Sequence, residues 1–160
     1  MKKRVPVSQI MTKNVVTLST KDDLVTAEEL FKNNRIRHIP VTSGNEVLGM
    51  LSYTDLMRIS FADAIDENEQ DVDTMVYNMF TIEQVMVKDV ICVSAKATVQ
   101  EVAAFLAQKE FHALPVVEVN ELVGILTTFD LLKYSFKQAI SLGETEVFNE
   151  AVFIKYSGNI

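Results

Sequence analysis

Some apolar residues of this chain form short runs typical of strands, and others recur at the intervals typical of helices. The same order of runs and intervals occurs twice. Short runs rich in β-branched residues, Val15 to Leu18 and Val90 to Val93, predict strands. Apolar residues at helical intervals come next: Leu24, Ala27, Leu30 and Phe31 in the first half, and Val99, Val102, Ala103 and Leu106 in the second. Two more apolar runs and a last helix follow. Each half is therefore predicted to read strand, helix, strand, strand, helix.

Polar residues mark where the predicted helices begin and where the chain turns. Thr98 and Glu101 have the spacing of a capping box, and Asp23 stands at the matching cap position of the first half. Residues 43–45 and 120–121 separate the second and third apolar runs of each half. Such short connections favour antiparallel hairpins. We expect each half to form a small three-stranded sheet with helices on one face.

The two halves are copies of one unit. A shift of 75 residues aligns identical residues without a gap: Met11 with Met86, Pro40 with Pro115, Gly49 with Gly124, and Asp55 with Asp130. This constant shift indicates an internal duplication. One copy alone buries too little apolar area to offset its chain entropy. The copies are therefore expected to pack about a pseudo-twofold axis as one α/β (α+β) module.

The duplication sets the expected boundaries. The first repeat spans residues 7–60 and the second spans residues 82–141, with residues 61–81 as an acidic linker and connecting helix, and residues 142–160 as a C-terminal tail. The tail is too apolar for a plain disordered terminus. We expect it to dock on its own module or on a second subunit.

The linker combines an acidic stretch with an apolar one. Its acids are Asp63, Asp66, Glu67, Glu69, Asp71 and Asp73. We interpret them as a solvated loop, with an electrostatic partner or a cation site as the alternative. Four apolar residues follow at helical spacing: Met75, Val76, Met79 and Phe80. They are predicted to return to the core as a helix that leads to Ile82.

Charge and cysteine content narrow the classes of function. Fifteen basic against 22 acidic side chains give a formal charge of −7, which repels polyanions and argues against a nucleic-acid partner. Cys92 is the single cysteine, and its apolar neighbours predict a buried small hydrophobe in a reducing cytoplasm. The start of the chain lacks the apolar region of a signal peptide, and no uncharged apolar run approaches the roughly 18 residues that cross a bilayer.

Two short motifs occur in each copy. An apolar residue with proline precedes one strand, and Gly-apolar-x-Ser/Thr-x-x-Asp ends the next: Ile39–Pro40 with Gly49–Asp55, and Leu114–Pro115 with Gly124–Asp130. With the segments 10–12 and 85–87 that lead into each repeat, these motifs resemble the CBS domain family over nearly all of residues 7–141. The resemblance implies a stand-alone tandem pair of CBS domains, often called a Bateman module. Such pairs generally act as regulatory sensors, and many bind adenosine nucleotides between the repeats.

Carried over by motif position, the resemblance implies roles for the residues that end each Gly-to-Asp motif. Asp55 and Asp130 would accept hydrogen bonds from ribose hydroxyls, since an ionised carboxylate only accepts. Ser52 and Thr127 would face the phosphate at a helix N-terminus, where free N–H groups and the helix dipole favour an anion. The alternative is structural, because the same spacing suits simple helix caps with an acid in the first turn.

Basic residues supply further candidate phosphate contacts. Arg37 and His112 occupy equivalent places three residues before each proline, where basic side chains reach phosphates in nucleotide-binding relatives. Each also has a structural alternative, a surface ion pair for Arg37 and a locally bonded, partly buried imidazole for His112. His38 is a weaker candidate. Arg58 and Lys133 also align under the shift of 75 residues. Basic residues at these helix positions usually indicate a solvated helix face.

The purine ring needs a flat apolar slot. The early strands offer residues for it, and so do the apolar–proline motifs: Val15, Val16 and Thr17, Val90, Ile91 and Cys92, Ile39 and Pro40, and Leu114 and Pro115. Most of these side chains must also serve the core. They are therefore candidates for the purine slot, but their apolar character alone does not indicate a binding site.

The leading functional hypothesis is a regulatory module that binds an adenine nucleotide between its repeats and signals to an unidentified regulated protein or across a homodimer. No other cofactor is expected. The alternative is a ligand-free dimerisation or scaffold module. An enzyme is the least supported class, because two histidines and one cysteine supply no nucleophile–base–orienter set and no metal-ligand spacing.

Overall fold

The computed structural model of the chain describes residues 4–62 and 77–141. The first copy contains α1 (Leu24–Asn34), β1 (His38–Ser43), β2 (Glu46–Ser52) and α2 (Tyr53–Ala62). The second contains β3 (Val93–Ser94), α5 (Val99–Leu106), β4 (Ala113–Glu118), β5 (Glu121–Thr127) and α6 (Thr128–Ser141). Two short elements precede the copies: the 3-10 turn η1 (Val7–Gln9) and α4 (Ile82–Val85).

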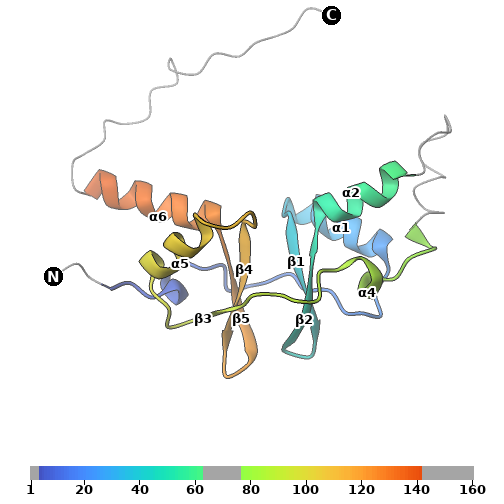
Figure 1. Cartoon of the computed structure of the whole chain (residues 1–160), viewed down its shortest axis with the longest axis horizontal. Coiled ribbons are helices and arrows are strands. Elements are labelled where there is room, and N and C mark those ends of the chain that lie inside the picture. The colour runs from blue at the N-terminus through green and yellow to red at the C-terminus, as the bar shows by residue number, and fades with distance from the viewer. Residues whose placement is uncertain (1–3, 63–76, 142–160) are drawn as a thin grey trace, which may run out of the picture.

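Figure 1 shows the two copies side by side, with the hairpins β1–β2 and β4–β5 adjacent at the centre and the helices of each copy towards the outside. Both hairpins are antiparallel and carry a bulge at the same relative place, between Val41 and Thr42 and between Val116 and Val117. The expected hairpins are thus confirmed. The arrangement is the predicted mixed α/β fold made of two repeats.

The predicted first strands are shorter than the apolar runs suggest. In the second copy β3 comprises only Val93 and Ser94, which pair in parallel with β4 and complete a three-stranded sheet. In the first copy the sheet has two strands, and the run from Val15 contributes a single parallel bridge between Leu18 and Val41. The prediction of a strand over residues 15–18 was therefore wrong in extent. Upstream of Leu18, Thr12 and Val15 belong to the contact with the other copy.

The helix starts match the sequence prediction. The Asp23 side chain accepts a hydrogen bond from the Thr26 N–H at 2.7 Å, and this bond lowers the pKa of the Asp23 carboxyl. Thr98 and Glu101 form the predicted capping box of α5. An equivalent box between Thr81 and Gln84 begins α4. Each cap satisfies backbone N–H groups that have no partner within the helix.

The copies exchange their leading segments, residues 7–12 and 82–87. Thr12 and Ile125 trade backbone hydrogen bonds of 2.9 Å in both directions, and so do Val87 and Met50. The duplication shift relates these two pairs to each other. The segment that precedes each repeat is thus hydrogen-bonded to the second hairpin strand of the other repeat.

Side-chain packing follows the same exchange. Ile82 and Met86 belong to the core of the first copy, and Val7 belongs to the core of the second. A smaller cluster between the copies joins Met50, Ala113 and Ile125, with Val15 and Val90 packed against it. Each core therefore needs residues from both halves of the sequence.

Glycine at the bend of each hairpin strand makes the exchange possible. A Cβ added at Gly124 would collide with the sulfur of Met11, and a Cβ added at Gly49 would collide with the sulfur of Met86. Both side chains point into space that only a residue without a side chain leaves free. The Gly of each Gly-to-Asp motif is thus explained by close approach rather than by backbone conformation.

The linker prediction fails for two of its apolar residues. Met79 and Phe80 are 73% and 40% exposed and do not return to the core. Their place is taken by Tyr77, which is 2% exposed and packs in the core of the first copy. The chain turns after Tyr77 instead of continuing as one helix into α4, so the helical spacing does not extend across this junction. Met75, Val76, the acidic residues 63–73 and the tail 142–160 lie outside the described residues.

We predict that Gly124→Ala destabilises the protein by about 1–3 kcal/mol, the usual cost of overpacking a filled site. Urea unfolding of the variant and the parent measures it. Met11→Ala removes the colliding sulfur, so Gly124→Ala should cost clearly less in that background. Equal costs in both backgrounds would contradict the packing described above.

Candidate functional site

A cleft of about 410 Å³ opens between the two copies. The first copy contributes the start of β1, the end of β2 and the first turns of α2. The second contributes the segment after α4 and the segment that enters β4. The lining residues are Arg37, His38, Met50, Ser52, Thr54, Asp55, Arg58, Val87, Asp89, Val90, Ile91, Glu110, Phe111, His112, Ala113 and Leu114.

Ser52, Asp55 and Arg58 form a hydrogen-bonded chain on one wall of the cleft. The Ser52 hydroxyl donates to the Asp55 carboxylate and accepts from the Asp55 N–H at 3.1 Å. Arg58 donates to the other carboxylate oxygen at 3.3 Å. The Asp55 side chain remains 30% exposed, so its carboxylate has oxygen lone pairs within reach of a ligand. Ser52 acts as a cap while it also lines the cleft.

The equivalent residues of the second copy form a similar cap. The Thr127 hydroxyl donates to the Asp130 carboxylate at 2.7 Å, and the Asp130 N–H donates to the Thr127 hydroxyl at 3.2 Å. Lys133 does not pair with the acid here but lies over the Phe129 ring, 4.3 Å from its centroid. Thr127 and Asp130 are not among the residues that line the 410 Å³ cleft. Ser52 and Asp55 thus line the same cleft as Arg37 and His112, whereas Thr127 and Asp130 lie outside it.

Histidines from both copies meet at the cleft. Burial lowers the pKa of His38 below its ordinary value of 6.5, the charge of His112 lowers it further, Asp55 acts in the opposite direction and Arg37 adds to the lowering. The described lining holds two arginines and three carboxylates. With both imidazoles neutral the formal charge of the lining is −1, and with both protonated it is +1. The imidazoles therefore decide the sign of the local charge.

The apolar part of the cleft comes mainly from the second copy. Val90, Ile91 and Leu114 line it, as does the aromatic ring of Phe111. Ile91 is half exposed, so part of its side chain is accessible from the cleft. These residues form a surface against which a flat ring could pack.

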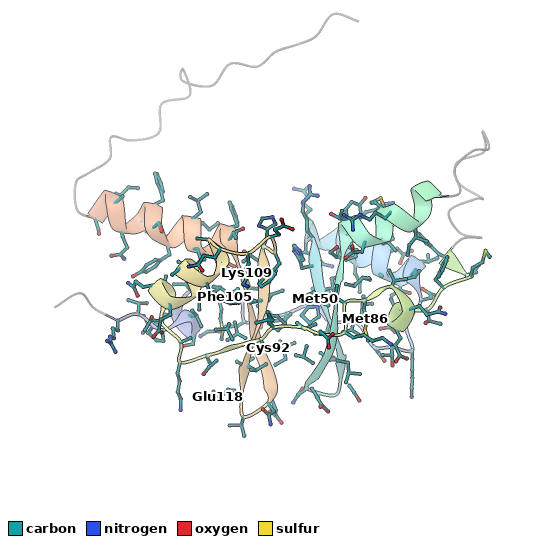
Figure 2. The ribbon with its side chains drawn as sticks, in the orientation of Figure 1. Met50, Met86, Cys92, Phe105, Lys109 and Glu118 are labelled. Carbon is teal, nitrogen blue, oxygen red and sulfur yellow. The ribbon has the colours of Figure 1, made fainter. Side chains whose placement is uncertain are left out.

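The prediction that Cys92 is buried was wrong. Cys92 is exposed, and it does not line the cleft. Partial burial of its sulfur raises the pKa of the Cys92 thiol. The reason for the exposure is that β3 begins one residue later, so Cys92 lies in the segment between α4 and β3 and not inside a sheet (Figure 2).

The remaining candidates for the base slot lie elsewhere. Ile39, Pro40 and Pro115 are buried in the hairpins and do not line the cleft. Val16 packs against the core of the first copy, and Thr17 is exposed. The apolar–proline motifs therefore contribute to the cleft through Leu114 and through the basic residues that precede each motif.

The two halves also agree with a known family. The model of the CBS domain matches residues 7–62 and again residues 82–137. The chain belongs to the CBS domain family. Its two matches are the two repeats that the internal duplication indicates.

Proteins similar to this CBS pair come from archaea and bacteria. The protein MJ1225 of Methanocaldococcus jannaschii is 31% identical over 129 residues, which are 80% of this chain and 42% of MJ1225. The chain thus spans less than half the length of this curated relative. Among solved structures, a candidate acetoin utilization protein (AcuB) from Vibrio cholerae has a TM-score of 0.73 and 26% identity, and the match covers 90% of this chain and 99% of that protein.

A third similar structure was solved with a bound nucleotide. The protein CBSX2 in complex with AMP has a TM-score of 0.69 and 20% identity, and the match covers 83% of this chain and 97% of CBSX2. At this level of identity the likeness concerns the fold. It places the CBS pair among proteins of the same architecture.

Within residues 4–62 and 77–141, no group of three or more His, Cys, Asp or Glu side chains could hold a metal ion. Nor is any described helix both long and apolar enough to traverse a lipid bilayer.

Several lining residues were not candidates in the sequence. Asp89, Glu110 and Phe111 belong to no motif, Thr54 is an unspecified position of the Gly49–Asp55 motif, and His38 was only a weak candidate. The exchange of leading segments brings residues 87–91 to the α2 side of the first copy, and the duplication shift gives no indication of that exchange. Phe111 could have been found as the neighbour of His112, and Thr54 as the neighbour of Asp55.

We predict that the free energy of unfolding decreases as the pH falls below about 6.5, in a way that depends on His38. Its folded pKa is lowered, so the unfolded chain binds more protons in this range, and the contribution is fully present above the unfolded pKa and is lost as the pH falls. Urea unfolding at fixed pH values measures the slope. His38→Gln should flatten it, and His112→Gln should flatten it in part, because one charge acting on His38 is gone. Equal slopes in parent and His38→Gln would exclude this effect.

Proposed function

We propose that this CBS pair is a regulatory module that binds an adenine nucleotide in the cleft between its repeats and transmits the bound state to another protein. The observation that carries the proposal is the composition of the cleft, which unites Ser52 and Asp55 of the first copy with Ile91 and His112 of the second. A carboxylate, a helix N-terminus, basic side chains and an apolar wall are the groups that a nucleotide requires.

Each part of a nucleotide has a matching group. Asp55 accepts hydrogen bonds from the two ribose hydroxyls, because an ionised carboxylate has four acceptor positions and no proton to donate. Ser52 at the start of α2 donates a hydrogen bond to the phosphate, and Arg37 and His112 offset its negative charge. Ile91 and Phe111 pack against the adenine ring. The Ser52 hydroxyl then exchanges its bond with Asp55 for a bond with the phosphate.

Similar proteins support the choice of ligand. CBSX2 was crystallised with AMP and has the same fold. Because identity to CBSX2 is 20%, the proposal depends on the residues of this cleft and takes only the ligand class from that protein. Neither catalysis nor any further cofactor is part of the proposal, and the cytoplasm, which supplies adenine nucleotides, is the proposed compartment.

Regulation follows from the position of the cleft. Its walls belong to different copies, so a ligand that contacts both favours the relative position of the copies in which those contacts are complete. The size of that shift equals the difference in the free energy of binding between the two arrangements. The regulated protein binds differently to the two arrangements of the repeats.

A scaffold without ligand is the second candidate, and one observation favours it. The pairs Ser52–Asp55 and Thr127–Asp130 bond to each other at the start of their helices, as the residues of a simple helix cap do. Calorimetric titration with AMP, ADP, ATP and S-adenosylmethionine separates the candidates. Binding at micromolar to low millimolar ligand is expected. If every ligand of the panel gives only its heat of dilution, the nucleotide-binding function is excluded and the scaffold is favoured.

We predict that Asp55→Ala weakens nucleotide binding about 10-fold to 100-fold, the range for loss of hydrogen bonds to a charged group. Asp130→Ala, tested separately, is expected to weaken any binding in the equivalent site of the second copy. Calorimetry on each variant measures the affinity and the number of sites. Unchanged affinity in both variants would remove the ribose assignment.

A matched control separates binding from helix capping. Glu101→Ala removes the carboxylate that accepts from the Thr98 N–H and hydroxyl in the capping box of α5, and so weakens the start of that helix. Glu101 does not line the cleft. This variant should therefore bind nucleotide like the parent, whereas weakened binding would show that the Asp55 result reflects stability.

We also propose that two copies of the CBS pair associate through α6. No residue of α6 is buried within the described chain, and its large apolar residues are 47% to 64% exposed: Phe129, Leu132, Phe136 and Ile140. They recur at helical spacing on one face. A second copy offers an identical stripe, so a twofold contact can cover both.

Leu132→Asp should shift the protein from dimer to monomer, because it places a charge at the centre of the apolar contact. Light scattering after size-exclusion chromatography measures the mass. Val119→Asp, at an exposed turn position with positive φ that aspartate tolerates, is the matched control and should leave the mass unchanged. A parent that is monomeric at high concentration would refute the dimer.

A further inference from the structure

A second cavity of about 240 Å³ lies next to the cleft on the first copy. Its lining residues are Phe31, Lys32, Arg35, Ile36, Arg37 and Tyr53. Three of them carry a positive charge, and none of the described lining residues is acidic. In a chain of net charge −7, such a concentration of positive charge is a local exception that points to an anion.

The two cavities share a wall. Arg37 lines both, and the successive residues Ser52 and Tyr53 line one cavity each. The Tyr53 N–H donates to the Arg37 carbonyl oxygen at 2.9 Å, which fixes the start of α2 against the residue that precedes β1. The point proposed for a nucleotide phosphate is therefore adjacent to the basic cavity.

The end of α1 sets the place of the other two cations. Arg35 is the C-cap residue, with φ of 53°, and its N–H donates to the Lys32 and Phe31 carbonyls. Lys32 also pairs with Glu28 at 2.9 Å. Both cations are exposed, and the negative end of the α1 dipole lies beside them. Each is therefore expected to contribute modestly to binding an anion.

We infer that the basic cavity is a subsite for the outer phosphates of a nucleoside di- or triphosphate. The inference rests on the proposed function, since it places the nucleoside and first phosphate in the cleft. From Arg37 the phosphate chain continues past Tyr53 to Lys32 and Arg35. The CBS pair then ranks its ligands by phosphate number, with ATP and ADP above AMP.

The main alternative is that these cations only stabilise the end of α1, where positive side chains are favourable in any case. That role predicts no dependence of affinity on the number of phosphates. The length of the phosphate chain is thus the variable that separates a subsite from a helix cap.

The test compares the affinities for AMP and ATP, in the presence of EDTA and of Mg²⁺, for the full chain and for Lys32→Gln/Arg35→Asn. Asparagine suits the left-handed backbone at residue 35. Lys21→Gln/Lys96→Gln is the matched control, because it removes equal charge from exposed residues that line neither cavity. Urea unfolding of each variant checks that the fold is kept.

The parent and the Lys21/Lys96 control should bind ATP about 2-fold to 10-fold more tightly than AMP, the range expected for two exposed charge contacts. Lys32→Gln/Arg35→Asn should lose this preference and keep its affinity for AMP. Equal binding of AMP and ATP by the parent, or a preference for ATP that survives in the variant, would overturn the subsite and leave the proposed function in place. If AMP and ATP both fail to bind the parent, the proposed function falls and the subsite falls with it.

Discussion

The structure depends on the hydrogen-bonded contact between each leading segment and the hairpin of the other repeat. Thr12 pairs with Ile125 and Val87 pairs with Met50 through two backbone bonds each. The neighbouring methionines fill the space that Gly124 and Gly49 leave free. Because backbone bonds and packed side chains act at the same two points, the relative position of the repeats is fixed more firmly than by apolar contact alone. The central cluster of Met50, Ala113 and Ile125 is small and could not define that position by itself.

The same contact creates the cleft. It brings residues 87–91 of the second half against the start of α2 in the first half, so apolar and polar walls come from different repeats. Positive and negative side chains then line the same cleft, and the protonation of its two histidines determines the sign of its formal charge. The cleft therefore exists only where the two repeats meet, unlike a pocket inside a single repeat.

Local features of the fold were predictable, and features that depend on long-range contact were not. The hairpins, the cap at Asp23 and the capping box at Thr98 follow from spacing within a few residues. The extent of the first strands was not predictable, because Val15 and Val90 pack between the repeats instead of in a sheet. Cys92 was placed wrongly for the same reason. The candidate site was predicted in part: Ser52, Asp55, Arg37 and His112 meet at the cleft. Asp89 was missed, because it reaches the cleft only through the exchange of leading segments.

The exchange also bears on how such a pair arises. A chain with a single repeat would have a leading segment with no hairpin of its own to bind and a core with one side open. Two such chains satisfy each other by swapping these segments, and joining them end to end keeps every contact while removing the dependence of folding on concentration. After fusion the two halves are free to diverge wherever the swap does not constrain them. Thr54 and Phe129, which occupy equivalent positions beside the two acids, differ between the halves of this chain, whereas both glycines and both methionines are the same.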